Sequence, residues 1–321
     1  MAKYAIITSF LGELRDRFCL YNTPRSIAEK LETAAGIPGI TGVEMIYPYD
    51  FQDFDPVASA LRRLNLGVAA VNINVKGERE FIAGSLTSSD PDIRAKAVRF
   101  LHEGMDAAAA LGCDKVTVCP LSDGYDYAFQ ADYTGDWRRL RDAFGEAAAH
   151  RPEIMLCLEY KPNETRVRST LSDAHATILL IRELGSPNLG ITVDLGHALY
   201  AGETPARTLS MLTHYGIRPY IHLNDNYRNW DWDLMPGSVN IWDTLEFLWT
   251  ANAIGYDDWF TFDVFPSRMD PAACFAVSAK MLTALQGIAH TLDPAELNEY
   301  RSRGDTPGLI GYVWRRAGLL S

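Results

Sequence analysis

Eight short apolar runs, separated by stretches with helical start and stop signals, recur along the first 291 residues of the chain. The runs are rich in Val, Ile and aromatic residues, and most do not alternate with polar residues, which is typical of strands covered on both faces. We expect buried strands at residues 4–8, 42–46, 68–73, 115–119, 154–159, 189–194, 219–223 and 259–263.

Helices are expected between these strands because Asp-Pro or Thr-Pro pairs open several of the intervening segments and glycines close most of them. The expected helices cover residues 24–35, 56–65, 91–111, 136–150, 173–184, 205–215, 238–254 and 271–291. Strand and helix alternating eight times predict an α/β fold, the (β/α)8 TIM barrel, which uses about 250 residues. A doubly wound open sheet is the alternative, but it favours a glycine fingerprint after the first strand, where residues 9–12 read SFLG.

Two kinds of segment interrupt this rhythm. Long loops at residues 10–21, 74–89 and 120–135 follow strands, on the face where barrel enzymes keep their sites, or are surface insertions without a function. Residues 1–291 are expected to form the barrel domain, and residues 292–321 a short C-terminal helical extension broken at residues 304–308. Its apolar residues, such as Trp314 and Leu319, predict packing against the barrel itself or against a partner subunit.

The charge of the chain limits its partners. With a net charge of −11 and a pI of about 5.1, the protein should repel nucleic acid and anionic membranes. The five cysteines form no CxxC pair, which favours reduced thiols in the cytoplasm, and Cys157 is expected in the core. No basic, apolar leader follows Met1 and no apolar run approaches about 18 residues, so we expect a cytoplasmic protein with no membrane span.

Polar residues with metal-ligand chemistry end the last four expected strands. Because the carboxyl ends of all strands in a barrel open into one mouth, these side chains should meet there. Imidazoles and carboxylates arriving together suit a divalent ion that accepts nitrogen and oxygen ligands. The residues are Glu159 and Lys161 after the fifth strand, Asp194 and His197 after the sixth, His222, Asp231 and Asp233 after the seventh, and Asp263 after the eighth.

Five carboxylates in one mouth require neutralisation. At a separation of about 4 Å and an effective dielectric near 20, each pair of like charges repels by about 4 kcal/mol. Two divalent ions together with Lys161 would balance five negative charges, while a single ion, or protonated acids without a metal, are the alternatives. Each residue also has a structural interpretation, since Glu159 could pair with Lys161 and Asp194 could cap a helix.

At these residues the sequence resembles the xylose-isomerase-like barrels, a superfamily that includes xylose isomerase, L-rhamnose isomerase, the ketose 3-epimerases and the endonuclease IV repair enzymes. The resemblance covers the barrel and is clearest over residues 155–265. The Glu-Tyr-Lys-Pro segment at 159–162 and the strand-seven His222 look closer to L-rhamnose isomerase than to xylose isomerase.

The resemblance implies roles for individual residues. It implies a first ion held by Glu159, Asp194, His222 and Asp263, and a second held by Asp194, His197, Asp231 and Asp233. It implies catalytic roles for Lys161, Glu159 and Asp231, and substrate contacts by Lys161, His197, Arg228, Glu44 and Asn72. No histidine precedes His102, so the ring-opening role of an early-strand histidine is either vacant or filled by Glu44, Asn72 or water.

The resemblance therefore implies an aldose–ketose isomerase that depends on two divalent ions, Mn²⁺, Mg²⁺ or Co²⁺. It would convert a small uncharged sugar by a metal-assisted 1,2-hydride shift, the sugar being a pentose, a branched pentose such as apiose, or a 6-deoxyhexose. A homodimer or homotetramer is the family habit.

Two other functions are alternatives. A ketose 3-epimerase would work through a metal-bound enediolate, and Arg228, six residues after His222, matches an arginine of those enzymes. Asp263 counts against it, because a glutamate is usual there. A binding protein without catalysis, or a repair nuclease, is a third class, but the acidic charge and only two strand-end histidines disfavour the nuclease.

Overall fold

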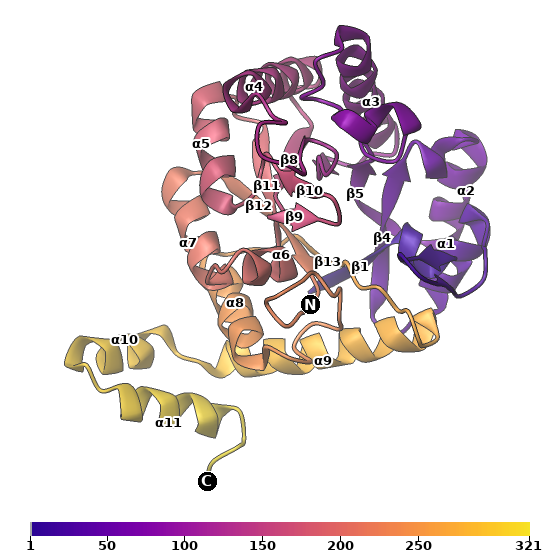
Figure 1. The fold of residues 1–321 in the computed structure, drawn as a ribbon. Helices are drawn as coiled ribbons and strands as arrows, with labels where there is room; N and C mark the ends of the chain where they lie inside the picture. The colour runs from indigo at the N-terminus through magenta and orange to yellow at the C-terminus, as the bar shows by residue number, and fades with distance from the viewer. Residues whose placement is uncertain (1) are drawn as a thin grey trace.

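The computed structural model describes residues 2–321 and contains a closed barrel of eight parallel strands (Figure 1). Neighbouring strands follow the order β1-β13-β12-β11-β8-β6-β5-β4 around the barrel. All eight expected strands are confirmed, with ends that shift by at most two residues. The strands are β1 Lys3–Ile7, β4 Ile40–Tyr47, β5 Gly67–Ile73, β6 Lys115–Val118, β8 Met155–Glu159, β11 Leu189–Asp194, β12 Arg218–Leu223 and β13 Trp259–Phe262.

A ring of helices surrounds the barrel, as Figure 1 shows. They are α1 Ile27–Gly36, α2 Phe54–Leu64, α3 Pro91–Ala110, α4 Tyr133–His150, α5 Ala174–Leu184, α7 Pro205–Tyr215, α8 Ile241–Ala253 and α9 Pro271–Thr291, with a short additional helix, α6 Leu195–Tyr200, after β11. The first helix begins at Ile27 rather than at residue 24. Ser26 caps it there, accepting a hydrogen bond from the Glu29 amide while the Glu29 carboxylate accepts one from the Ser26 amide.

Small sheets and short helices lie in the segments that connect the barrel elements. β2 Leu14–Arg15 pairs with β3 Leu20–Tyr21, and β7 Gly124–Tyr125, β10 Val167–Ser169 and β9 Asn163–Glu164 form a three-stranded sheet. Single turns of 3₁₀ helix, η1 Thr8–Leu11, η2 Tyr49–Phe51 and η3 Arg79–Ala83, follow β1, β4 and β5. The expected long loops are therefore partly ordered by local pairing.

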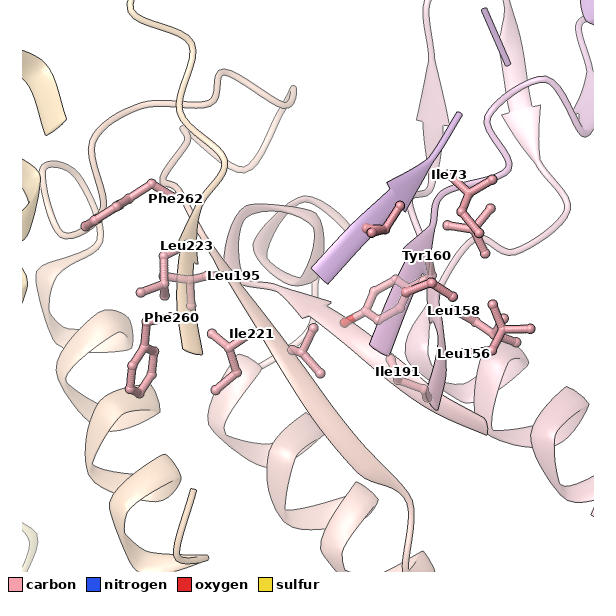
Figure 2. Close-up of a cluster of buried hydrophobic side chains, with 14 of the residues drawn as sticks. Ile73, Leu156, Leu158, Tyr160, Ile191, Leu195, Ile221, Leu223, Phe260 and Phe262 are labelled. Carbon is pink, nitrogen blue, oxygen red and sulfur yellow. The ribbon is translucent and has the colours of Figure 1, made fainter. Parts of the chain in front are cut away.

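Side chains alternate between the barrel interior and the helices along each strand. On β8, Leu156 and Leu158 belong to the large core between sheet and helices, part of which Figure 2 shows. Met155 and Cys157 belong instead to the smaller cluster that includes Ala5, Ala70 and Tyr220 inside the barrel. Glu159 continues the inward series, so the strand directs its carboxylate toward the mouth.

The C-terminal extension consists of α10 Pro294–Arg303 and α11 Thr306–Arg316, which follow α9 and extend to one side of the barrel in Figure 1. The expected break at residues 304–308 was wrong in its length. Gly304 ends α10, but α11 begins at once because Asp305 caps it by accepting a hydrogen bond from the Gly308 amide. Trp314 stacks on Trp242 of α8 with ring centroids 5.3 Å apart. The extension thus packs on its own barrel, and a subunit contact stays a prediction.

Helix α9 is long and apolar enough to cross a membrane by length and composition alone. Its buried residues include Phe275, Ala279 and Leu282, which belong to the main core. A barrel helix of this kind passes the same test of length and hydropathy, so α9 is weak evidence for a membrane.

We expect Gly104→Ala to destabilise the barrel and Gly287→Ala to stabilise it. A Cβ at Gly104 in α3 would lie 2.6 Å from Cγ1 of Ile73 on β5, whereas a Cβ at Gly287 in α9 would meet nothing within 4 Å. Overpacking costs about 1–3 kcal/mol, and alanine improves on glycine in a helix interior by about 0.5–1 kcal/mol. Denaturant unfolding of both variants measures the difference, and equal free energies of unfolding would contradict the packing.

Candidate metal centre

The structure brings together four of the predicted ligands from four neighbouring strands. Glu159, Asp194, His222 and Asp263 each place one ligand atom within 4.8 Å of the others. Nδ1 of His222 lies 3.4 Å from Oε1 of Glu159 and 3.4 Å from Oδ2 of Asp263. Ligand atoms bound about 2.1 Å from one ion at a tetrahedral angle are about 3.4 Å apart, so this spacing fits a divalent cation.

The second predicted set lies beside the first. Nε2 of His197 is 3.1 Å from Oδ2 of Asp231, and Nζ of Lys161 is 2.7 Å from the same oxygen. Lys161 also forms an ion pair with Glu164 of β9. Asp233 is close enough to Asp231 and Lys161 for their charges to act on it. This group therefore offers an imidazole and carboxylates around a buried ammonium.

The loop that carries Asp231 and Asp233 is held by backbone pairing. The amides and carbonyls of Asp225 and Leu234 exchange two hydrogen bonds of 2.9 Å. Asp233 adopts a φ of 47°, a left-handed conformation that aspartate tolerates better than most residues. Its carbonyl accepts a hydrogen bond from the amide of Phe265, beyond β13. The chain after β12 is thereby folded back against the end of β13.

Asp194 is oriented by two separate contacts. Its Oδ1 accepts a hydrogen bond from the His197 amide, which caps α6. The side-chain amide of Asn224 donates to both carboxylate oxygens, at 3.0 and 2.8 Å. A Cβ at Gly196 would lie 1.7 Å from Oδ1 of Asn224, so only glycine leaves room for this arrangement. The capping role and the ligand position are therefore compatible.

A fully buried carboxylate lies beneath the ligands and orients His222. Oε2 of Glu44 on β4 lies 2.8 Å from Nε2 of His222 and accepts a hydrogen bond of 2.6 Å from the Tyr220 hydroxyl. Its other oxygen accepts a hydrogen bond of 2.7 Å from the Asn72 side chain. A carboxylate that holds one imidazole nitrogen and leaves the other facing a metal is the usual arrangement around ligating histidines.

The protonation of the site reflects its crowded charges. Burial raises the pKa of Asp194 to about 7 and raises that of Asp233 well above its ordinary value. Burial acts to lower the pKa of His197, but the Asp194 and Asp231 carboxylates outweigh it and raise that pKa to about 9. Burial acts to raise the pKa of Glu159, but the charge of His222 lowers it to about 2. Where no metal ion is bound, protons on these side chains thus reduce the net negative charge of the site.

Several buried polar atoms in the site have no hydrogen-bond partner among the described residues 2–321. They include Nδ1 of His197, Nδ1 of His222 and Oδ1 of Asp231, each on a side chain that is at most 8% exposed. Leaving buried polar atoms without partners costs about 1–3 kcal/mol each. Cations bound among these atoms would satisfy them, so the residues present fit divalent metal ions.

The three remaining predicted substrate contacts lie in different surroundings. Glu44 and Asn72 are bonded to each other beneath His222, in the barrel interior. The Arg228 guanidinium is partly exposed, lies 2.7 Å from Oδ2 of Asp243 and donates a hydrogen bond of 3.2 Å to Asn240. Arg228 therefore contacts two residues at the start of α8, Asn240 and Asp243.

Sequence reasoning did not assign a role to two residues at the site. Cys119 directly follows β6, and its Sγ lies within 4.8 Å of ligand atoms of Glu159 and His197. The signal was present, because residue 119 ends the fourth apolar run and shares the inward parity of Thr117. Asn224, which holds Asp194, was another residue whose role the sequence did not indicate.

The fold and the site together define a class, the parallel (β/α)8 barrels with a group of potential metal ligands at the mouth. Within this class, the chain belongs to the family described as xylose isomerase-like TIM barrel, which it matches over residues 31–285.

Comparisons with individual proteins agree with this family. The xylose isomerase of Thermus thermophilus is 29% identical over 188 residues, which are 57% of this chain and 49% of the relative. The xylose isomerase of Dinoroseobacter shibae is 26% identical over 254 residues, which are 75% and 57% of the two chains. This chain spans about half the length of the relatives it matches. A solved structure of L-ribulose 3-epimerase shares the fold, with a TM-score of 0.71, 21% identity, and coverage of 92% of this chain and 98% of that one.

We expect Glu44→Gln to weaken Mn²⁺ binding to the metal-free protein by about 10–100-fold, the usual cost of removing a group that orients a metal ligand. The loss follows because the neutral amide no longer holds His222 by charge. Calorimetric titration with Mn²⁺ measures the affinity. Glu103→Gln is the matched control, since Glu103 also accepts a hydrogen bond from a tyrosine hydroxyl, that of Tyr47, but belongs to none of the groups of potential metal ligands among the described residues. Equal affinities for the two variants would contradict the orienting role.

Proposed function

We propose that this protein is a divalent-metal-dependent aldose–ketose isomerase that acts on a small uncharged sugar. The observation that carries the proposal is the presence of two adjoining ligand groups, one around Glu159 and His222 and one around His197 and Asp231, with the ammonium of Lys161 beside the second. The names of the matched relatives, both xylose isomerases, support the same reaction class. Two ions of Mn²⁺, Mg²⁺ or Co²⁺ would polarise the sugar carbonyl and lower the pKa of a bound hydroxyl or water.

Lys161 is proposed to stabilise negative charge on the carbonyl oxygen of the sugar. Its side chain is 6% exposed, and although burial acts to lower its pKa, Asp231 and Glu164 raise that pKa well above the ordinary value. The ammonium is therefore charged throughout the physiological range. In a site closed to water, a fixed positive charge of this kind interacts more strongly with a developing oxyanion than it would in solution.

Asp231 is proposed to take part in moving the hydroxyl proton of the substrate. Its Oδ2 contacts both Lys161 and His197, while Oδ1 is buried without a partner. The charges of Lys161 and His197 hold its pKa below the ordinary value, against the effect of burial. Asp231 is thus a carboxylate with one oxygen that no hydrogen bond occupies among the described residues. Glu159, the acid shared by both imidazoles, is proposed to hold the ion that binds the sugar.

An uncharged sugar is proposed because the mouth is already crowded with acids, and the protein carries a net charge of −11. A phosphorylated or carboxylated substrate would add repulsion to this field. Pentoses, branched pentoses such as apiose, and 6-deoxyhexoses are the proposed candidates. A homodimer or homotetramer and a cytoplasmic location also belong to this proposal.

A ketose 3-epimerase is the second candidate function. The observation in its favour is that Glu159, Asp194, His222 and Asp263 form a complete four-residue group by themselves, which would hold one ion. Against it, Arg228 is engaged by Asp243 and Asn240, and β13 is followed by an aspartate, whose side chain is one carbon shorter than that of glutamate. The two candidates differ in chemistry, because epimerisation removes a carbon-bound proton and a hydride shift does not.

We expect chelator-treated protein to be inactive and to regain aldose–ketose interconversion with Mn²⁺, Mg²⁺ or Co²⁺. Pentoses, apiose and 6-deoxyhexoses are incubated with the protein in D₂O, and products are identified by NMR. A hydride shift leaves the transferred hydrogen undiluted by deuterium, whereas epimerisation at carbon 3 incorporates solvent deuterium. Metal-restored epimerisation without interconversion would establish the second candidate, and no turnover of any sugar in the panel would refute both.

We expect Lys161→Met to keep metal affinity within a few-fold but to lower kcat by about 10²–10³-fold, the usual cost of losing a group that stabilises an oxyanion. Steady-state kinetics and calorimetry are measured on the same preparations. Lys115→Met is the matched control, because Lys115 is also buried and paired with two acids, Asp114 and Asp258, but begins β6 at the opposite end of the barrel. Similar kcat losses in both variants would show a stability effect, not a role at the site.

A further inference from the structure

A buried thiol adjoins the candidate metal centre and has no role in the proposed isomerisation. Cys119 is 3% exposed and follows β6, which lies between β5 and β8 in the barrel. Its Sγ, a carboxylate oxygen of Glu159 and a ring nitrogen of His197 all lie within 4.8 Å of one another. Among the residues that the structure describes, Cys19, Cys113, Cys157 and Cys274 belong to no group of this kind.

The imidazole next to this thiol has an unused nitrogen. Nδ1 of His197 is buried, has no hydrogen-bond partner, and lies 3.4 Å from Oε1 of Glu159. His197 as a whole is 4% exposed, so bulk water does not satisfy this atom. The other nitrogen, Nε2, is occupied with Asp231. His197 therefore directs Nε2 toward Asp231 and Nδ1 toward Glu159, and one of its two ring nitrogens belongs to the group with Cys119.

The three donors differ in chemistry from the rest of the mouth. The predicted centre consists of carboxylate oxygens and imidazole nitrogens, which suit Mn²⁺, Mg²⁺ and Co²⁺. A thiolate added to one imidazole and one carboxylate is a ligand set for Zn²⁺ or for the softer Cd²⁺, whose bonds to sulfur are about 2.3 Å or longer. Zn²⁺ and Cd²⁺ therefore gain a sulfur ligand by binding on the Cys119 side of Glu159, whereas Mg²⁺ gains little from sulfur.

We propose that Cys119, His197 and Glu159 form an alternative site for a thiophilic divalent cation, Zn²⁺ or Cd²⁺, which shares two residues with the two-ion centre. Binding forms a sulfur–metal bond and releases the thiol proton to water. Because Glu159 and His197 also belong to the proposed two-ion centre, a cation held by Cys119 competes with the ions that support turnover. Only this inhibitory consequence rests on the proposed function, since the binding itself does not require catalysis.

The test follows the sulfur–metal bond directly. Metal-free full-length protein is titrated with Cd²⁺ and separately with Co²⁺ while the sulfur-to-metal charge-transfer absorption is recorded. We expect the band in the wild type and in Cys113→Ser, the control at the other end of β6, and no band in Cys119→Ser or Cys119→Ala. Cd²⁺ affinity of the Cys119 variants should fall at least about tenfold, since loss of even an outer contact costs about 10–100-fold.

Two further measurements separate the outcomes. The ¹¹³Cd chemical shift of the wild type reports sulfur coordination without any variant, so a folding defect in Cys119→Ser does not block the test. A shift typical of nitrogen and oxygen ligands alone, or an undiminished band in Cys119→Ser, would overturn the proposal. If the band depends on Cys119 and no sugar is turned over, the thiophilic site stands and the isomerase proposal fails. If Mn²⁺ restores turnover and no sulfur contact forms, the reverse holds.

Discussion

The mouth of this barrel depends on the neutralisation of carboxylates that are buried close together. Asp194, Asp231 and Glu159 are each at most 8% exposed, and the protein's own cations nearby are the Lys161 ammonium and imidazoles that can take up a proton. The pKa of His197 is raised to about 9 and that of Asp194 to about 7, which favours the uptake of protons where no cation is bound. Divalent ions would replace those protons, so the same repulsion that makes the site costly gives it affinity for cations.

Support for the ligands comes from across the barrel. Glu44 on β4 reaches His222 on β12, and the Tyr220 hydroxyl below it bonds both Glu44 and Thr261 of β13. Asn72 of β5 completes the contacts of the carboxylate. Interior side chains of four strands therefore form one hydrogen-bonded layer under the mouth. A layer of this kind restricts the rotation of His222, which lowers the entropy lost when an ion binds.

The sequence indicated which candidate ligands would lie together, but not the residues that support them. Glu159, Asp194, His222 and Asp263 were identifiable because each ends a strand, and parallel strands in a barrel share one mouth. Glu44 lies within a strand, where sequence alone does not show whether a carboxylate reaches substrate or another side chain. The roles of Arg228 and Cys119 depended on loop paths and on distances between strands, which have no sequence period. The starts of α1 and α11 differ from the expected positions because single capping residues, Ser26 and Asp305, decide them.

The sharing of Glu159 and His197 between two kinds of ligand set has a consequence for metal selection. Affinities for nitrogen, oxygen and sulfur sites generally rank Zn²⁺ above Mn²⁺ and Co²⁺, so a site selects the weaker binder by ligand type and geometry. A centre built from oxygen and nitrogen donors favours Mn²⁺ or Co²⁺, whereas a thiol at its edge favours Zn²⁺. Because the thiophilic set takes two ligands away from the centre, the ion that the protein carries should depend on which cation is available. The residue at position 119 thus affects which metal ion the centre binds, and the proposed chemistry depends on that ion.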